Sequence, residues 1–195
     1  LPASVTSIAD DAFGGCSSLT SIKVDKENKY YDSRNNCNAI IATESNTLVI
    51  GCKNTTIPAS VTRLGEHAFA NCSGLTSITI PQSVTSIGYY TFAGCSDLTS
   101  ITIPQSVTSI GDYAFASCRR GLVIYCYKDS TAYEYAMEKV SITVELIGET
   151  ETPGDTSGDD KPTPTPIPEP TPEPTPTPTP EKPTATPAKK GATLT

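Results

Sequence analysis

The feature that most constrains this chain is an internal repeat with a period of 23 residues. The segments 57–65, 80–88 and 103–111 align without gaps, and a fourth copy opens the chain at 1–8. A single unit of this length cannot bury its own apolar residues, whereas stacked units share one continuous core. The sequence therefore predicts a solenoid.

The apolar positions of each repeat recur in register along the chain. They are Val5/Val61/Val84/Val107, Ile8/Leu64/Ile87/Ile110, Phe13/Phe69/Phe92/Phe115, Cys16/Cys72/Cys95/Cys118, Leu19/Leu75/Leu98 and Ile22/Ile78/Ile101/Ile124. Because these positions repeat together, we expect them to form the core of the stack.

Each repeat is predicted to contain two short extended runs and one helical turn. Residues 75–80 end in an alternating β-branched pattern, and Pro81 cannot extend the hydrogen-bonded ladder. Residues 84–87 form a second extended run before Gly88. Residues 89–93 are predicted to form about one helical turn, because their apolar members are spaced to share one face.

Two regions depart from the period. Residues 25–56 are predicted to hold two strands joined by 42–45, an irregular hairpin that makes the stack bulge. Residues 123–148 are predicted to close the stack with a helix capped by Ser130 and followed by a strand. We expect the apolar face of that helix to cover the core with Ala132, Tyr135, Ala136 and Met137.

The repeat pattern is Ile-Pro-x-Ser-Val-Thr-x-Ile-Gly-x-x-Ala-Phe-x-x-Cys-x-x-Leu-Thr-Ser-Ile, present in four copies over 1–24 and 57–126. It closely resembles the BspA-like, or treponemal-type, leucine-rich repeat of bacterial surface proteins. The resemblance implies a mostly β, α/β-type repeat solenoid with a right-handed coil over residues 1–148. It also implies a secreted or cell-surface location, because BspA-like proteins are associated with binding host matrix proteins and with bacterial co-aggregation.

The C-terminal part of the chain has a different composition. Thirteen of the 17 prolines follow residue 152, and residues 149–188 are rich in Pro, Thr and Glu. Such a run lacks a core and favours extended polyproline II, so we expect a disordered stalk or linker. O-glycosylation or recognition by a proline-binding groove are alternatives. Residues 189–195 regain strand-like character, and together with a start at Leu1 this indicates a piece of a larger protein whose next domain begins there.

Charge and hydropathy exclude several partners. The net charge is −7, without a basic patch for nucleic acid or anionic lipid, and no run approaches the roughly 20 apolar residues of a membrane helix. We expect a monomer that does not insert into a membrane.

Seven cysteines can indicate disulfides in a secreted protein. Cys16, Cys72, Cys95, Cys118 and Cys126 occupy core positions, so we expect them to be buried thiols. A disulfide between Cys37 and Cys52, both in the predicted hairpin, is an alternative that the sequence does not decide. No metal site is predicted, because the chain has one histidine and no Cys-x-x-Cys spacing.

The search for catalytic motifs indicates a protein that is not an enzyme and needs no cofactor. His67 falls in the predicted helical turn, where we expect an exposed side chain. Adjacent acidic pairs such as Asp159/Asp160 suit solvated segments better than acid–base catalysis.

The remaining candidates for a functional site are residues on the surface. In the predicted register the outward strand positions form a row ending in an aromatic residue, comprising Lys23, Ser77, Thr79, Ser100, Thr102 and Tyr125. This row and the irregular loop around Tyr30 and Tyr31 are the candidate contacts for an unidentified extracellular protein or glycan. The alternatives are that Ser and Thr only fill the strands and that the loop tyrosines only cover the core.

Two functional hypotheses follow. One is a secreted or cell-surface adhesion module that mediates host or inter-bacterial contacts. The other is an architectural spacer or accessory domain of a larger secreted enzyme, for example a carbohydrate-active one.

Overall fold

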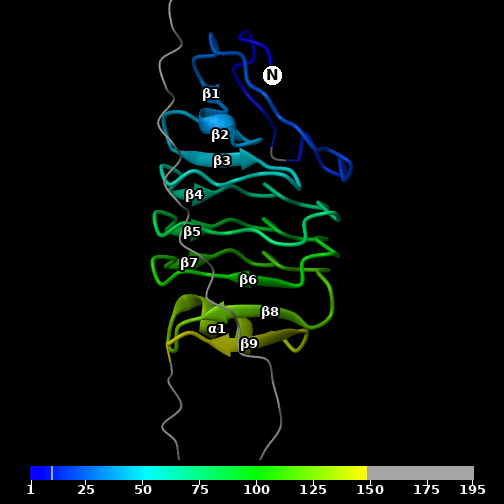
Figure 1. Cartoon of the computed structure of the whole chain (residues 1–195), viewed down its shortest axis with the longest axis vertical. Coiled ribbons are helices and arrows are strands. Elements are labelled where there is room, and N and C mark those ends of the chain that lie inside the picture. Colours follow the sequence, from blue (N-terminus) through cyan, green and yellow to red (C-terminus); the bar gives the residue numbers. More distant parts are fainter. Residues whose placement is uncertain (10, 149–195) are drawn as a thin grey trace, which may run out of the picture. The chain divides into compact units, whose positions relative to one another are not determined.

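Extended runs of the regular coils pair in parallel with the same runs of the next coil and form two sheets along the molecule, the first of which also includes antiparallel strands (Figure 1). The computed structural model describes residues 1–9 and 11–148. In one sheet β4 (Arg63–Leu64) pairs with β5 (Ser86–Ile87), which pairs with β7 (Ser109–Ile110). Their partners lie one period apart, so the mostly β solenoid predicted from the repeats is confirmed.

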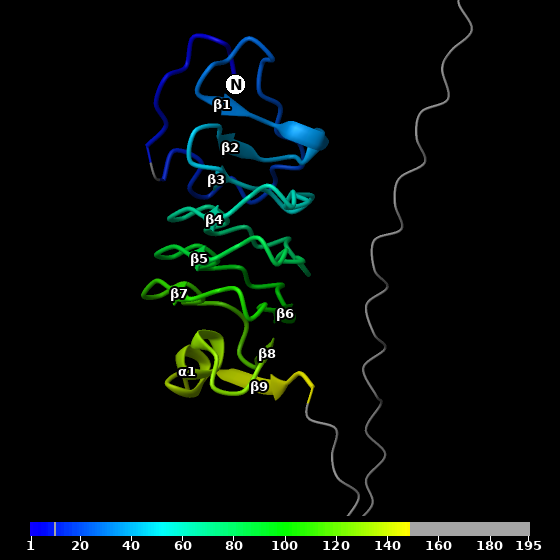
Figure 2. The same cartoon turned by 90° about the vertical axis from the view of Figure 1, so that its left-hand side faces the viewer.

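The second sheet lies on another side of the stack, as the two views show together (Figures 1 and 2). It contains β6 (Ser100–Thr102), β8 (Leu122–Cys126) and β9 (Ile142–Leu146), all parallel. Thr79 of the preceding coil extends it by an isolated bridge to Thr102.

The irregular region is the predicted hairpin. The strand β2 (Ile40–Ala42) is antiparallel both to β1 (Tyr31–Asp32) and to β3 (Thr47–Ile50), and the short 3-10 helix η1 (Arg34–Asn36) lies between β1 and β2. Because β3 then pairs in parallel with β4, the hairpin joins the first sheet directly and the stack remains continuous.

The predicted helical turn in each repeat is wrong. His67, Tyr90 and Tyr113 have φ values of +54°, +52° and +57°, which a right-handed helix excludes. Instead, the backbone N–H of Phe69 donates to Thr91 O at 2.8 Å and that of Phe92 donates to Ala114 O at 2.8 Å. Other N–H groups of the segment donate three residues back, as Ala70 does to His67 O at 2.9 Å and Ala93 does to Tyr90 O at 3.0 Å. The segment therefore forms a series of turns hydrogen-bonded to the next coil.

The core contains rows of side chains that come from the same position in successive repeats. Phe69, Phe92 and Phe115 are stacked with ring centroids 5.2 and 5.3 Å apart, and all three are buried. A second, smaller cluster around Ile22, Ile40 and Ile50 packs the first coil against the hairpin.

The structure bears on the cysteines individually. All seven are free thiols, including Cys37 and Cys52, which are both buried. Cys72, Cys95 and Cys126 are buried as predicted, and Cys118 is half-buried. The prediction for Cys16 is wrong, because its coil lies at the end of the stack and only one face is covered (Figure 1).

The C-terminal cap forms as predicted. Its helix α1 (Thr131–Met137) begins after Ser130, whose hydroxyl accepts from the backbone N–H of Tyr133 at 3.2 Å. Ala132 and Ala136 are buried, whereas Met137 is 62% exposed and does not cover the core. One residue beyond Ala136 the helix has turned by about 100°, which carries Met137 to the outer face.

No helix in the described part of the chain is long and apolar enough to cross a membrane. The predicted stalk at 149–188 and the predicted domain start at 189–195 lie outside the described residues.

Candidate binding surfaces

The predicted row of hydroxyl side chains follows the second sheet, with Ser100, Thr102 and Tyr125 in its strands, Thr79 joined by a bridge and Ser77 two residues before that bridge. Its members Ser77, Thr79, Ser100, Thr102 and Tyr125 are called the hydroxyl ribbon below. Direct pairing places Thr102 beside Tyr125 and Thr79 beside Thr102, so three consecutive coils contribute to one row. Ser77 and Thr79 are exposed, and the other three are half-buried.

The ribbon extends further than the sequence indicated, because Tyr125 pairs with Glu145 of β9 in the cap. That continuation is not visible in the repeat pattern, since β9 lies after the periodic region. Lys23 is exposed but lies in the first coil, outside both sheets, where its carbonyl accepts from the N-terminal amine of Leu1 at 2.6 Å. The pairing within the sheet therefore does not include Lys23.

The loop tyrosines divide between two roles. Tyr30 is 54% exposed, whereas Tyr31 in β1 is half-buried against the smaller core cluster. Both line a depression of about 490 Å³ together with Lys29, Glu44 and Ser45. This loop offers aromatic and charged groups side by side, as a specific contact requires.

Arg34 follows this loop in the sequence, and its guanidinium group already binds other residues of the fold. Its Nη2 lies 2.6 Å from Asp32 Oδ2, and its Nη1 donates to Asn46 Oδ1 at 2.8 Å. Desolvation opposes ionisation of Asp32, but the hydrogen bonds and charge of Arg34 outweigh it and lower the pKa of this carboxyl. The pair fixes the turn after β1.

A further surface was not predicted. His67, Tyr90 and Tyr113, one from each coil, stack with centroids 5.4 and 5.2 Å apart and interplanar angles of 5° and 17°. Tyr89 contacts all three edge-on, at 6.0, 4.2 and 5.8 Å. These four residues are called the aromatic ladder.

The prediction of an exposed His67 is wrong, because its ring stacks on Tyr90 and is half-buried. The signal for the ladder was present in the sequence: His67, Tyr90 and Tyr113 each follow the repeat glycine by two residues. The prediction of a helical turn obscured this signal, because side chains on the surfaces of helices in separate repeats are not expected to stack on one another.

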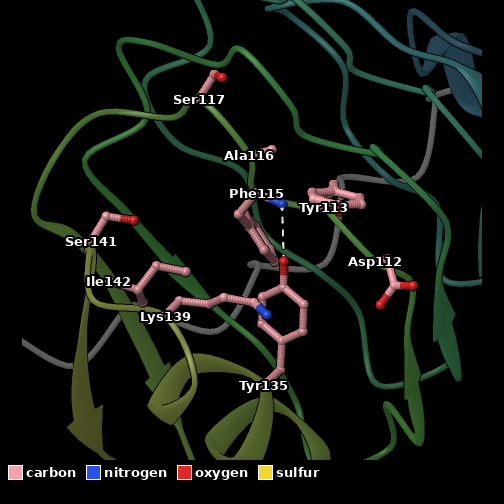
Figure 3. Close-up of a pocket in the computed structure, with 9 residues that line it drawn as sticks. All are labelled: Asp112, Tyr113, Phe115, Ala116, Ser117, Tyr135, Lys139, Ser141 and Ile142. Atoms are coloured by element: carbon pink, nitrogen blue, oxygen red, sulfur yellow. Dashed lines mark hydrogen bonds between the residues drawn. The ribbon is translucent and has the colours of Figure 1, made fainter.

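The ladder ends at a pocket of about 340 Å³, called the ladder-end pocket (Figure 3). Asp112, Tyr113 and Ser117 line it from the last regular coil, and Tyr135, Lys139 and Ser141 line it from the cap. Lys139 Nζ lies 5.1 Å from the centroid of the Tyr135 ring and 3.6 Å from Glu138. The Tyr135 hydroxyl accepts from the backbone N–H of Phe115 at 3.4 Å.

These surfaces offer ring faces, hydroxyls and a few charged groups. Within residues 1–9 and 11–148, no group of three or more His, Cys, Asp or Glu side chains gathers as a metal site requires.

A family model described as "BspA type Leucine rich repeat region" matches six copies in this chain, over residues 1–49 and 39–150. The search of curated proteins found no significant match.

Several solved structures are similar. A leucine-rich repeat protein from Eubacterium ventriosum is 30% identical with a TM-score of 0.56, covering 65% of this chain and 35% of that one. A leucine rich cell surface protein from Faecalibacterium prausnitzii is 26% identical with a TM-score of 0.44, covering 71% of this chain and 45% of that one. The chain thus spans less than half the length of either protein.

Proposed function

Because this chain belongs to the BspA-type leucine-rich-repeat family, we propose that it is a bacterial binding module, secreted or displayed on the cell surface, that holds an extracellular protein or glycan. Repeat proteins of this kind expose one side of a long sheet whose outward positions can vary without disturbing the core. The family model covers residues 1–49 and 39–150, so nearly all of the described solenoid takes part in this architecture.

The observation that carries the proposal is the hydroxyl ribbon with its aromatic end. Strand pairing sets Thr79, Thr102 and Tyr125 side by side in three consecutive coils. Adjacent parallel strands lie about 4.8 Å apart, so the ribbon presents hydrogen-bonding groups at a regular spacing. Tyr125 adds a large, stiff side chain, the type that carries much of the energy in binding surfaces.

Two further surfaces support a binding role. The depression beside Tyr30 combines aromatic and charged side chains in the predicted irregular hairpin, and the aromatic ladder exposes Tyr89 and Tyr113. Exposed aromatic groups of this kind cost solubility, and they are enriched in recognition surfaces.

The test uses the full 195-residue chain on an array of host matrix proteins, mucins, bacterial cell walls and polysaccharides. One variant carries Ser77→Lys and Thr79→Lys, which add charge and bulk at exposed ribbon positions. Its matched control carries Gln82→Lys and Gln105→Lys, which add the same charge at exposed positions off the ribbon. A second variant is Tyr30→Ala.

We expect selective binding that the ribbon variant loses and the control retains. Loss in Tyr30→Ala alone moves the contact to the loop and leaves the binding function standing. Absence of binding to every array member, from chain shown by circular dichroism to be folded, refutes the proposal and favours an architectural or accessory role.

A further inference from the structure

We propose that the ladder-end pocket binds one neutral pyranose unit of a glycan, with an apolar face of the sugar stacked on the ring of Tyr113. This inference rests on the proposed binding function and specifies a ligand class and a site for it. It concerns the end of the aromatic ladder and the cap residues that line the pocket there, none of which belongs to the hydroxyl ribbon.

The first step is that the ladder terminates at an accessible ring. One period beyond Tyr113 stands Ala136, which is buried in α1 and contributes no ring. The repeat His67, Tyr90, Tyr113 therefore stops where the cap begins, and Tyr113 is 56% exposed at the wall of the pocket (Figure 3). The stack behind Tyr113 holds its ring in a fixed orientation.

The second step is the backbone at the ladder positions. His67, Tyr90 and Tyr113 all lie in the left-handed region, where Gly or Asn is favoured over a bulky residue. An aromatic side chain there costs free energy, and Tyr113 recovers little of it by burial. Retention of a strained, exposed aromatic residue is typical of a position that serves a ligand.

The third step is the set of polar groups around the ring. Asp112 can accept hydrogen bonds, Lys139 can donate them, and the hydroxyls of Ser117 and Ser141 can do both. Burial, with smaller contributions from Cys118 and then Asp112, raises the pKa of Tyr135, so its phenol stays neutral. The pocket thus surrounds one flat apolar face with donors and acceptors.

This combination matches the chemistry of a pyranose ring. Such a ring has an apolar face of C–H groups and a rim of hydroxyls, and the weakly positive C–H groups are attracted to the negative face of an aromatic ring. A volume of about 340 Å³ is at the small end of ligand pockets, which suits one or two sugar units.

The charges select a neutral sugar. Lys139 is the single cation among the lining residues, and it already lies 3.6 Å from Glu138 and over the ring of Tyr135. Asp112 balances the charge of Lys139 among the lining residues. A uronic or sialic acid would compete with Glu138 for Lys139 and meet the like charge of Asp112, which favours a neutral sugar.

The experiment titrates the full chain by calorimetry with neutral oligosaccharides of glucose, mannose, galactose and N-acetylglucosamine, and with oligogalacturonate and sialyllactose as acidic probes. Tyr113→Ala removes the stacking face, and Tyr113→Phe retains it. Tyr127→Ala is the matched control, because it removes an aromatic residue that lines neither pocket and lies outside the hydroxyl ribbon. Circular dichroism of each variant establishes that it is folded.

We expect a neutral oligosaccharide to bind, at least about tenfold more weakly in Tyr113→Ala and within about threefold of the parent in Tyr113→Phe and Tyr127→Ala. Preference for an acidic sugar, or unchanged binding in folded Tyr113→Ala, overturns the inference. If no sugar binds while the array identifies a protein ligand, the sugar site is refuted and the binding function stands. If nothing binds in either assay, both are refuted.

Discussion

Truncating the central core phenylalanine tests whether the stack behaves as one tightly packed file. Phe92 is fully buried, and its ring lies 5.2 Å from that of Phe69 and 5.3 Å from that of Phe115, nearly parallel to both. Phe92→Ala removes the ring from between two others. The neighbouring coils cannot close over the gap, because backbone hydrogen bonds of 2.8 Å fix their separation on both sides of Phe92.

The expected cost follows from these contacts. Truncation of a buried Phe to Ala costs about 3–5 kcal/mol in total, a range whose upper end is reached where ring pairs worth about 0.5–1.5 kcal/mol each are lost. With two ring pairs lost and little relaxation possible, we expect a destabilisation of about 4–5 kcal/mol. Phe13 occupies the same repeat position in the first coil but is only half-buried, so Phe13→Ala should cost about 1–2 kcal/mol.

The assay is equilibrium unfolding in guanidinium chloride followed by far-ultraviolet circular dichroism, since the chain contains no tryptophan. A much lower midpoint for Phe92→Ala than for Phe13→Ala supports the continuous file. Equal costs for the two variants, or a cost below about 2 kcal/mol for Phe92→Ala, would show that the coils relax independently and refute the reasoning.

Two other consequences of the packing can be measured. Gly111→Ala places a Cβ 2.6 Å from Tyr89 N, so it should lower the unfolding free energy by about 2–3 kcal/mol in the same assay. The control Gly74→Ala should be near neutral, because its Cβ lies 3.2 Å from the flexible Lys53 side chain. A neutral effect of Gly111→Ala would contradict the observed coil spacing. Burial raises the pKa of Cys72 and Cys118 from 9.0 to about 11, so these thiols stabilise the fold fully below pH 9 and lose that contribution as pH rises to 11. Unfolding free energies measured from pH 8 to 11 should therefore fall, more steeply than in a Cys72→Ala/Cys118→Ala variant, and parallel curves would refute the assignment.

The periodic part of the fold could be predicted because each repeat position meets its own copy in the next coil. The side chains at 61, 84 and 107 share one environment, so their common repeat position is enough to predict that Val61, Val84 and Val107 are buried in the core. The hairpin was also predictable, since its alternating strands and polar turn are local signals. Burial at the stack end was not, because Cys16 has the repeat position of Cys72 but lacks a second neighbour.

The turn segment could not be predicted from local pattern alone. The spacing of Ala and Phe in 89–93 fits a helix, but the structure commits the N–H of Phe92 to Ala114 in the next coil. Whether these N–H groups bond within a helix or to the next coil depends on how the next coil packs against them. The periodicity within one repeat carries no information about that packing. The aromatic ladder was missed for the same reason.

The candidate sites follow from where the period stops. Within the regular coils, neighbouring copies cover much of one another, as Tyr90 is covered by His67 and Tyr113. At the cap, the last copy keeps an uncovered side, because Tyr113 has no ring beyond it. The hairpin instead supplies Tyr30 from outside the repeat pattern, beside a second depression. Repetition therefore supplies rigid, pre-positioned groups, and the irregular segments form the pockets. Changing the cap or the hairpin can alter what is bound without altering the core that supports it.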